Sequence, residues 1–341
     1  MARHASLPFD TVHVGGGTPS ILAGREIISI IETLHRLFNI QPNSEITLEV
    51  NPGTVDPEKL RQYKTAGINR LNIGVQSFHT AFLKFLGRIH TGKEAASVIH
   101  QARDIGFDNI GIDLIYGLPG QTRHSWITDL QTAVDFNPEH LSCYMLTCEK
   151  NTPLWKRMKD KAFLPLPDRN VTQQFNDAMV FLENNSYRQY EISNFAKSSP
   201  DASQNFTSRH NSKYWSFSPY CGFGPSAHSF REPRRRWNVR SIKKYIALIS
   251  QGRRPLAGEE TLSREQMMIE AVYLGLRQTH GIEIETYNRK FGVDFAVQFK
   301  ETITDLLREE HICIDKERCG LSRKGMVFLD SIAQMFVDKI R

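Results

Sequence analysis

Five short stretches rich in β-branched and apolar residues succeed one another along the first half of the chain. They span residues 9–14, 44–50, 70–77, 109–117 and 140–146. Segments with helical spacing of apolar residues lie between them, for example Ile27, Ile31, Leu34 and Phe38 on one face of residues 25–39. Strands that alternate with helices predict a parallel α/β architecture.

Polar residues gather on one side of three of these strands. Apolar and polar positions alternate at period two, and Glu49, Gln76 and Asp113 lie on the polar side near the strand ends. A parallel sheet covered by helices on both faces is apolar on both. One polar face therefore favours a barrel or partial barrel whose mouth holds a ligand. Each residue taken alone is also compatible with a helix cap or a turn contact.

Three consecutive glycines follow the first predicted strand, in "VHVGGGTPS" at residues 12–20. A phosphate-binding P-loop is excluded because no Lys follows, and the dinucleotide fingerprint needs glycine where Ser20 stands. A tight turn into a helix started by Pro19 explains part of the pattern. At the mouth of a barrel, the same glycines expose backbone groups to a polar ligand.

Composition limits the class of protein. The chain has 341 residues, of which 40% are apolar, and Lys plus Arg exceed Asp plus Glu by 43 − 37 = 6. This modest excess predicts no nucleic-acid surface. No apolar run reaches the length of a membrane span and the first residues carry no signal core, so we expect a cytoplasmic protein. Peripheral association with a membrane stays open.

The five cysteines do not form a recognisable pattern. Their odd number and the absence of a C-x-x-C pair argue against a disulfide framework, and no zinc or iron–sulfur site is predicted from their spacing. Cys143 lies in a predicted strand, where it is expected to pack in the core.

The second half of the chain predicts mixed structure. We expect an exposed connection over residues 153–168, a polar loop over 198–212 and a solvated basic connector over 231–257 that includes "REPRRRW". Beyond residue 258, a helix with a capping box at Ser263, a helix over 293–310 and a hairpin over 312–322 suggest a small winged-helix-like domain. The predicted domains are therefore 1–230, 231–257 and 258–341.

Several motifs in fixed order resemble one known family. "GGGTPS", "EVNPG", "GVQSF", "LGRIH" and "DLIYGLPGQ" are similar to radical S-adenosylmethionine proteins of the oxygen-independent coproporphyrinogen III oxidase type. "YEISNFA", "HNSKYW" and "GFGPSAHSF" resemble the heme-chaperone branch of that family, the HemW type. The resemblance covers nearly the whole chain.

The resemblance implies a partial (β/α)6 TIM-like barrel that holds S-adenosylmethionine at its mouth, followed by a HemN-like, winged-helix-like domain. It assigns the backbone of the glycine turn to the methionine part of the cofactor and a guanidinium to its carboxylate. Polar side chains would contact the ammonium and ribose groups. The residues implied are Gly16, Gly17, Thr18, Glu49, Gln76, Arg88, Asp113 and, for adenine, Thr147.

The sequence departs from the family in its iron–sulfur motif. The family carries C-x-x-x-C-x-x-C ahead of the glycine-rich turn, whose thiolates hold a [4Fe–4S] cluster. None of the eleven residues before Val12 is Cys. We therefore expect the first barrel strand and the cluster ligands to be absent, through truncation or a misassigned start.

The heme-chaperone motif implies a role for His210. In "HNSKYW" this histidine would be an axial ligand of heme iron, and the rings of Tyr214 and Trp215 would cover the porphyrin. His13 and His228 are competing ligands. The predicted function is a heme chaperone that transfers heme to apo-hemoproteins. The alternatives are a coproporphyrinogen III dehydrogenase that uses radical chemistry and an inactive truncated paralogue.

Overall fold

The computed structural model describes residues 7–198 and 204–340. The chain folds as two compact units that divide after His210. We call residues 7–210 the barrel unit and residues 211–340 the C-terminal unit.

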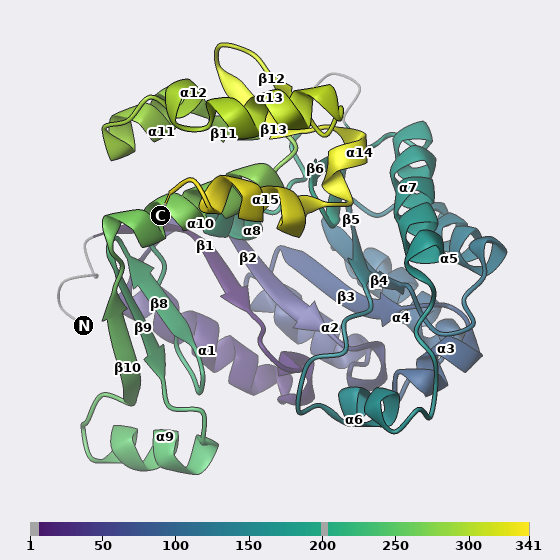
Figure 1. Cartoon of the computed structure of the whole chain (residues 1–341). Coiled ribbons are helices and arrows are strands. Elements are labelled where there is room, and N and C mark those ends of the chain that lie inside the picture. Colours follow the sequence, from purple (N-terminus) through teal and green to yellow (C-terminus); the bar gives the residue numbers. More distant parts are fainter. Residues whose placement is uncertain (1–6, 199–203, 341) are drawn as a thin grey trace. The chain divides into compact units, whose positions relative to one another are not determined.

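A curled seven-stranded sheet forms the barrel unit (Figure 1). Its order is β1-β2-β3-β4-β5-β7-β6; the first five strands are parallel, and β7 and β6 pair antiparallel. The strands are β1 (Pro8–Val14), β2 (Asn39–Val50), β3 (Arg70–Gln76), β4 (Ile110–Tyr116), β5 (His140–Met145), β6 (Tyr187–Glu191) and β7 (Asn194–Lys197). This arrangement confirms the α/β partial barrel predicted from the strand–helix alternation.

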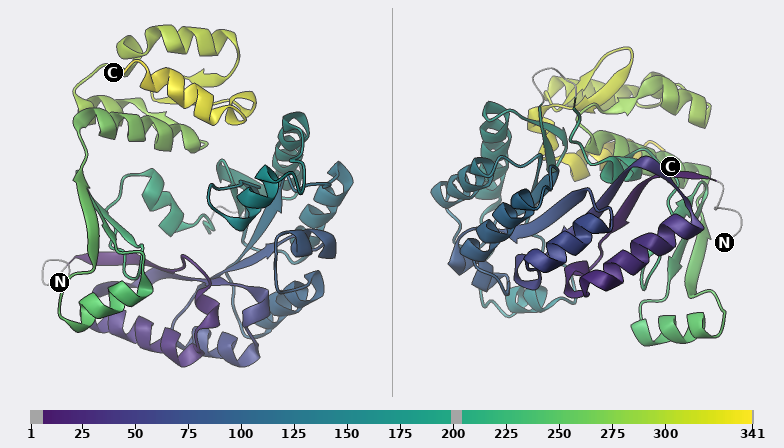
Figure 2. Two further views of the ribbon diagram at one scale, coloured as in Figure 1. Left: turned by 60° about the horizontal axis from the view of Figure 1, so that its bottom comes forward. Right: turned by 180° about the vertical axis from the view of Figure 1, so that it is seen from behind.

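Helices cover the outer face of the sheet, and Figure 2 shows the main ones side by side there. Their buried faces carry the residues predicted from helical spacing, such as Ile27 and Ile31. Asp56 and Thr91 cap two of them with side-chain hydrogen bonds. The helical elements are η1 (Pro19–Ile21), α1 (Gly24–Leu37), η2 (Pro52–Thr54), α2 (Pro57–Thr65), α3 (Thr80–Phe85), α4 (Gly92–Asp104), α5 (Arg123–Asp135), α6 (Pro153–Lys159), α7 (Asp168–Asn184) and α8 (Arg209–Trp215).

The inner face of the sheet is polar, as the alternation predicts. Strand register aligns its residues in rows: His13 pairs with Thr47, which pairs with Arg70. Further along, Asp113 pairs with Ser142. Because paired residues share a face, these side chains line one lumen.

Two segments expected to be irregular contain helices. Residues 153–168 include α6, which Thr152 caps by accepting a hydrogen bond from the Trp155 amide. The polar segment 198–212, of which residues 199–203 lie outside the described residues, ends in α8. The first segment is rich in Pro and Lys and the second in polar residues, so neither sequence indicated a helix. Caps and contacts of the folded chain stabilise the helices that form there.

The C-terminal unit begins with a three-stranded antiparallel sheet of β8 (His228–Arg231), β9 (Arg234–Asn238) and β10 (Leu256–Thr261). Helix α9 (Ile242–Ser250) joins β9 to β10. Residues 231–257 are therefore mostly regular structure rather than the expected connector. Arg235 pairs with Glu260 and Glu270, and Arg236 pairs with Glu259, so acidic neighbours on β10 and a helix hold this basic stretch in place.

The rest of the C-terminal unit is mainly helical and contains a small three-stranded sheet, in agreement with the predicted helices and hairpin. The expected helix over 293–310 is divided in two at Phe299. Phe295, Phe299 and Phe336 are fully buried against one another, with neighbouring ring centroids 4.8 and 5.1 Å apart. The elements are α10 (Arg264–Arg277), β11 (Ile282–Glu283), α11 (Ile284–Phe291), α12 (Phe295–Gln298), α13 (Lys300–Arg308), β12 (Ile312–Ile314), β13 (Arg318–Leu321), α14 (Arg323–Met326) and α15 (Leu329–Val337).

Among the described residues, no helix combines the length and the apolar character needed to cross a bilayer.

Candidate functional site at the mouth of the barrel

The glycine turn after β1 is shaped by two neighbouring side chains. A Cβ on Gly15 would lie 2.5 Å from both the Glu49 carboxylate and the His13 imidazole, so a side chain there would displace these two groups. Gly16 has φ +84°, which favours glycine, and its amide donates to Glu49 Oε2 at 3.3 Å. A Cβ on Gly17 would meet no atom within 4 Å. The turn is therefore fixed on one side and open on the other.

Glu49 connects this turn to a pair of histidines. His13 Nε2 lies 3.0 Å from Glu49 Oε1. The His13 ring stacks on the His210 ring, with centroids 4.6 Å apart and an angle of 10° between planes. His210 Nδ1 in turn lies 3.3 Å from the hydroxyl of Thr11. The predicted heme ligand thus faces β1, at the polar side of the barrel.

The backbone around His210 is fixed by a buried carboxylate. Glu45 accepts hydrogen bonds from the amides of Arg209 at 3.1 Å and His210 at 2.9 Å. The guanidinium of Arg70, which is fully buried, lies 3.7 Å from Glu45 and donates to the carbonyl of Phe206. Since two strands and the start of α8 meet at Glu45, this residue sets the position of His210 on the barrel.

Asp113 and Arg88 are electrostatically linked at the mouth. Burial raises the pKa of Asp113 to about 6; a hydrogen bond from Ser142 opposes the shift, and the nearby Glu49 charge adds to it. Burial lowers the pKa of Arg88 from its usual value, and the charge of Asp113 counteracts this. The structure therefore brings Glu49, Asp113 and Arg88 within electrostatic range of one another.

The other predicted site residues, Gln76, Thr18 and Thr147, lie at separate places in the barrel unit. Gln76 ends β3 with φ 69°, and its amide nitrogen lies 2.8 Å from where a Cβ on Gly74 would be, so it folds back over that glycine. Thr18 precedes η1 directly behind the glycine turn. Thr147 is exposed in the loop after β5, and its hydroxyl donates to the Met145 carbonyl at 3.4 Å. Within the described ranges, no contact joins Thr147 to Glu49, Asp113 or Arg88.

Several buried polar atoms of the lumen have no hydrogen-bond partner among the described residues. They include Thr47 Oγ1, Asn72 Oδ1 and His140 Nδ1. Burial and the Arg70 charge hold the pKa of His140 well below its usual value, so its ring is neutral, and its Nε2 lies 2.8 Å from the Tyr190 hydroxyl. Buried polar groups normally find a partner, so the lumen suits a polar ligand or ordered water.

The cysteines do not fit a [4Fe–4S] cluster. Cys143 lies buried in β5, where burial raises the pKa of its thiol, and burial raises the pKa of Cys319 to about 12. All five are free thiols, and they are dispersed over both units. Between residues 7 and 340, the described part holds no group of three His, Cys, Asp or Glu side chains able to bind a metal ion.

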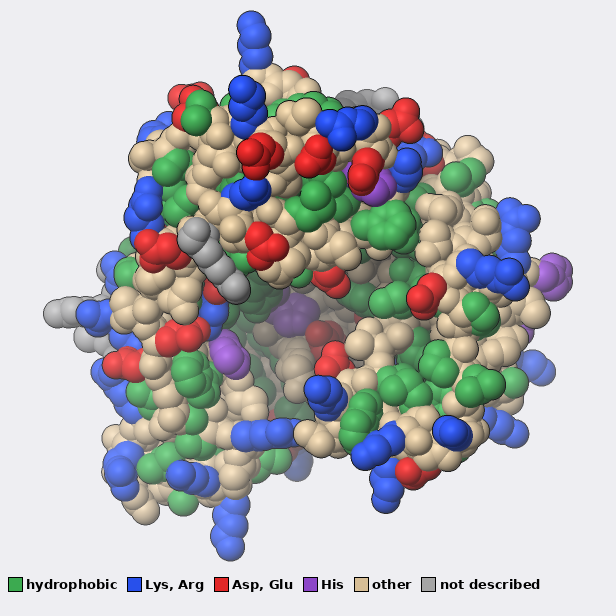
Figure 3. All heavy atoms as spheres, viewed as in Figure 1, with side chains coloured by type: hydrophobic (Ala, Val, Ile, Leu, Met, Phe, Trp, Pro, Cys, Tyr) green, Lys and Arg blue, Asp and Glu red, His purple; other side chains and the backbone are tan. Residues whose placement is uncertain are grey.

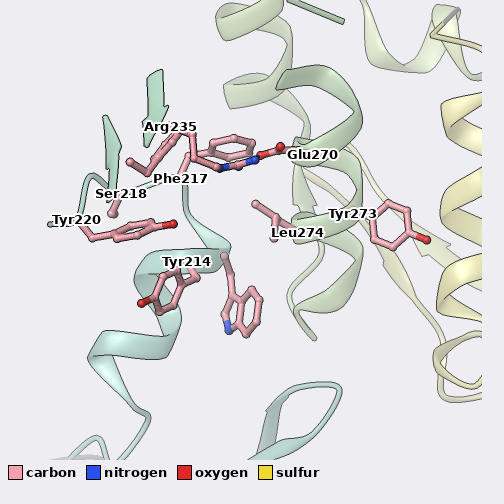
Figure 4. A pocket seen from close by; sticks show the side chains of 10 residues that line it. Tyr214, Phe217, Ser218, Tyr220, Arg235, Glu270, Tyr273 and Leu274 are labelled. Atoms are coloured by element: carbon pink, nitrogen blue, oxygen red, sulfur yellow. The ribbon is translucent and has the colours of Figure 1, made fainter. Parts of the chain in front are cut away.

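The C-terminal unit contains an aromatic pocket of about 370 Å³ (Figure 4). Tyr214 and Trp215 come from α8, and the guanidinium of Arg277 lies over the Trp215 ring at 4.6 Å. Arg235 on its wall pairs with Glu270 at 2.7 Å. The lining residues are Tyr214, Trp215, Phe217, Ser218, Tyr220, Phe230, Arg235, Glu270, Tyr273 and Leu274.

Comparison with known proteins agrees with this architecture. Residues 1–133 match the radical SAM superfamily, and residues 262–328 match the HemN C-terminal domain. The heme chaperone HemW of Bacillus subtilis is 33% identical over 342 aligned positions, which cover 100% of this chain and 88% of the relative. The chain belongs to the HemW family of radical SAM proteins.

A second relative and a solved structure extend this result. HemW of Lactococcus lactis is 30% identical, and the alignment covers 96% of this chain and 84% of the relative. The solved structure of coproporphyrinogen III oxidase (HemN) from Escherichia coli superposes with a TM-score of 0.82 at 24% identity, covering 96% of this chain and 78% of that one. This likeness establishes the fold of the HemW-family chain.

Three residues at this HemW-family site were not predicted as site residues from the sequence. His13 appeared only as a competing heme ligand, and Glu45 and Arg70 were not singled out. Their signal was present, because each lies on the polar side of its strand by the same period-two alternation that revealed Glu49. In each case, an ionisable residue on the inner face of a barrel strand indicated a site residue.

Proposed function

We propose that this chain is a heme chaperone, which binds heme with His210 as an axial ligand and transfers it to apo-hemoproteins. The observation that carries the proposal is the fixed position of His210: Glu45 holds its backbone, and Thr11 and His13 contact its ring. The relatives named as heme chaperones support the same activity.

The contacts of the ring favour one of its two nitrogens as the ligand atom. A metal-bound histidine usually makes a hydrogen bond through its second ring nitrogen, which fixes tautomer and orientation. Thr11 meets Nδ1, so Nε2 is the atom that we assign to iron. Tyr214 and Trp215 follow in the same helix, and we expect their rings to contribute contact area rather than iron ligation.

We further propose that the glycine turn binds S-adenosylmethionine. The open side of the turn and the polar lumen support a fit to this cofactor, which needs backbone contacts for its methionine part and polar groups for its ribose. Arg88 would bind the carboxylate, because a guanidinium matches that group with two hydrogen bonds. We assign the cofactor to Gly16, Gly17, Thr18, Glu49, Gln76, Arg88, Asp113 and, at the adenine end, Thr147.

The radical-enzyme alternative receives less support. Generation of a radical in this family depends on cluster thiolates, and the five cysteines of this chain are dispersed. The likeness to coproporphyrinogen III oxidase concerns fold. We therefore propose heme binding and transfer as the function, in the cytoplasm, where free cysteines remain reduced.

A heme titration of the full chain tests the proposal. We expect saturable one-to-one binding with a Soret band typical of histidine ligation. His210→Ala should weaken binding about tenfold or more and shift the band, because an iron ligand is lost. His228→Ala is the matched control, since this exposed histidine stacks on Trp237 outside the barrel. Equal binding by wild type and His210→Ala would refute the ligand assignment, and an absence of binding would favour the inactive paralogue.

Transfer is tested with the heme-loaded chain and an apo-cytochrome. A chaperone should pass heme at a rate that rises with the concentration of the recipient. A rate that stays equal to spontaneous heme dissociation into a scavenger would contradict direct transfer, even if heme binding is confirmed.

A further inference from the structure

Helix α9 forms the outer end of the β8–β10 sheet in the C-terminal unit (Figure 1). None of its residues is buried. Its half-buried side consists of Tyr245 and Leu248, and the Tyr245 hydroxyl accepts a hydrogen bond from the Gly224 amide at 3.1 Å. The remaining surface of the helix is exposed.

A row of isoleucines occupies this exposed surface. Ile242, Ile246 and Ile249 are 66%, 58% and 49% exposed. Their spacing of four and three residues places them on one face of the helix, where they form a continuous apolar strip. Single exposed apolar residues are ordinary, but an aligned row on a helix end marks a contact surface. We call these three residues the isoleucine stripe.

The segment that carries the isoleucine stripe contains several cations and no acidic residue. No Asp or Glu occurs between residues 233 and 258. Figure 3 shows basic and hydrophobic side chains together over this end of the molecule. Among the described residues, no acidic side chain pairs with the five exposed cations next to or on α9, which are Arg240, Lys243, Lys244, Arg253 and Arg254.

We propose that α9 docks peripherally on an anionic lipid surface, with the isoleucine stripe inserted between headgroups and the flanking cations on lipid phosphates. An interfacial helix needs an apolar face and a cationic surround, and α9 has both. The charge pattern argues against a second copy of the chain, because two such surfaces repel each other. Cations at both ends of α9 and along it match a continuous anionic surface, whereas a specific protein groove would need a matched set of carboxylates.

Co-sedimentation of the full chain with lipid vesicles tests this surface. We expect binding to vesicles that contain phosphatidylglycerol, weaker binding at high salt, and little binding to vesicles of phosphatidylcholine alone. Lys243→Gln, which removes a cation beside the stripe, should reduce partitioning about fivefold. Ile246→Glu should reduce it about tenfold or more, because a charge replaces an inserted apolar side chain.

Matched variants on the same unit control for surface effects. Val297→Ser changes an even more exposed apolar residue on α12, and Lys316→Gln removes an exposed cation away from α9. Both should bind vesicles like wild type, and all variants should retain heme binding because α9 lies outside the proposed heme and cofactor residues. Equal binding to neutral vesicles, or wild-type binding by Ile246→Glu, would overturn the proposal. Absent vesicle binding together with self-association that Ile246→Glu abolishes would assign the stripe to a dimer interface instead.

Discussion

The imidazole of His13 lies flat against the imidazole of His210, with the ring centroids 4.6 Å apart. One ring comes from the first strand of the barrel unit and the other from the start of α8. Through Glu49, the same His13 is connected to the glycine turn. The residue proposed to bind heme iron is therefore held by a side chain whose other contact belongs to the proposed cofactor site.

Removing the His13 ring should weaken heme binding without changing the iron ligand. His13→Ala should lower heme affinity about three- to tenfold, because stacked ring pairs contribute about 0.5–1.5 kcal/mol. His13→Phe keeps a ring and should stay within about twofold of wild type. Soret spectra should be the same for all three proteins. A spectral change in His13→Ala like that of His210→Ala would mean that His13 itself binds iron.

Glu45→Ala should reduce both stability and heme affinity. The substitution leaves the guanidinium of Arg70 buried without its carboxylate, which costs about 3 kcal/mol or more. It also removes the acceptor for the amides of Arg209 and His210. Urea unfolding and heme titration measure the two effects.

A double variant separates these effects. Glu45→Leu with Arg70→Met removes the pair and leaves no buried charge, so stability should recover toward wild type. Heme affinity should remain low, because the start of α8 still lacks its acceptor. Full recovery of heme affinity in the double variant would show that Glu45 acts only through stability and does not position His210.

Asp113 should make the fold less stable as pH rises. Its pKa is about 6 in the folded chain and about 4 in an unfolded chain, so between these values the folded chain binds more protons. The free energy of unfolding therefore falls as pH increases through this window. Asp113→Asn lacks this contribution and should be more stable than wild type at pH 7, by up to about 2 kcal/mol. Urea unfolding at a series of pH values measures it, and a variant less stable than wild type at neutral pH would contradict the prediction.

Anaerobic reconstitution with iron and sulfide should give no stoichiometric [4Fe–4S] cluster on this chain. The thiols are dispersed, and burial raises the pKa of Cys143 and Cys319, which disfavours the thiolates that clusters need. Iron and sulfide analysis with absorbance spectra provides the measurement. Substitution of Cys148 and Cys313 by Ser should remove any substoichiometric iron held at accessible thiols. One full cluster per chain would contradict the prediction and require new ligands.

Local periodicity explains which parts were predictable. The strands and the polar lumen follow from period-two alternation, which burial on one face imposes on every strand. The capping box at Ser263 likewise marked the start of α10. Helix α6 was not predicted because it is short and basic, and α9 was not predicted because it follows an Arg-rich stretch that suggested a connector.

Contacts between segments that lie far apart along the chain could not be predicted from the sequence. The motif that contains His210 identified the residue but not its neighbours Thr11, His13 and Glu45, which come from strands near the other end of the barrel unit. Such contacts depend on how the sheet curls and where α8 returns to it, and neither follows from local spacing. The assignments of Thr147, Arg88 and the other site residues to a cofactor or to heme stay predictions.

Glu49 has one carboxylate for two neighbours, the Gly16 amide and the His13 ring. A molecule that binds at the glycine turn and draws this carboxylate away loosens His13, and with it the ring that rests on His210. If His210 binds heme as proposed, thermodynamic reciprocity requires bound heme to change the affinity of the turn for that molecule by the same factor. A single acidic side chain thus gives the barrel a way to make cargo retention depend on what occupies its mouth.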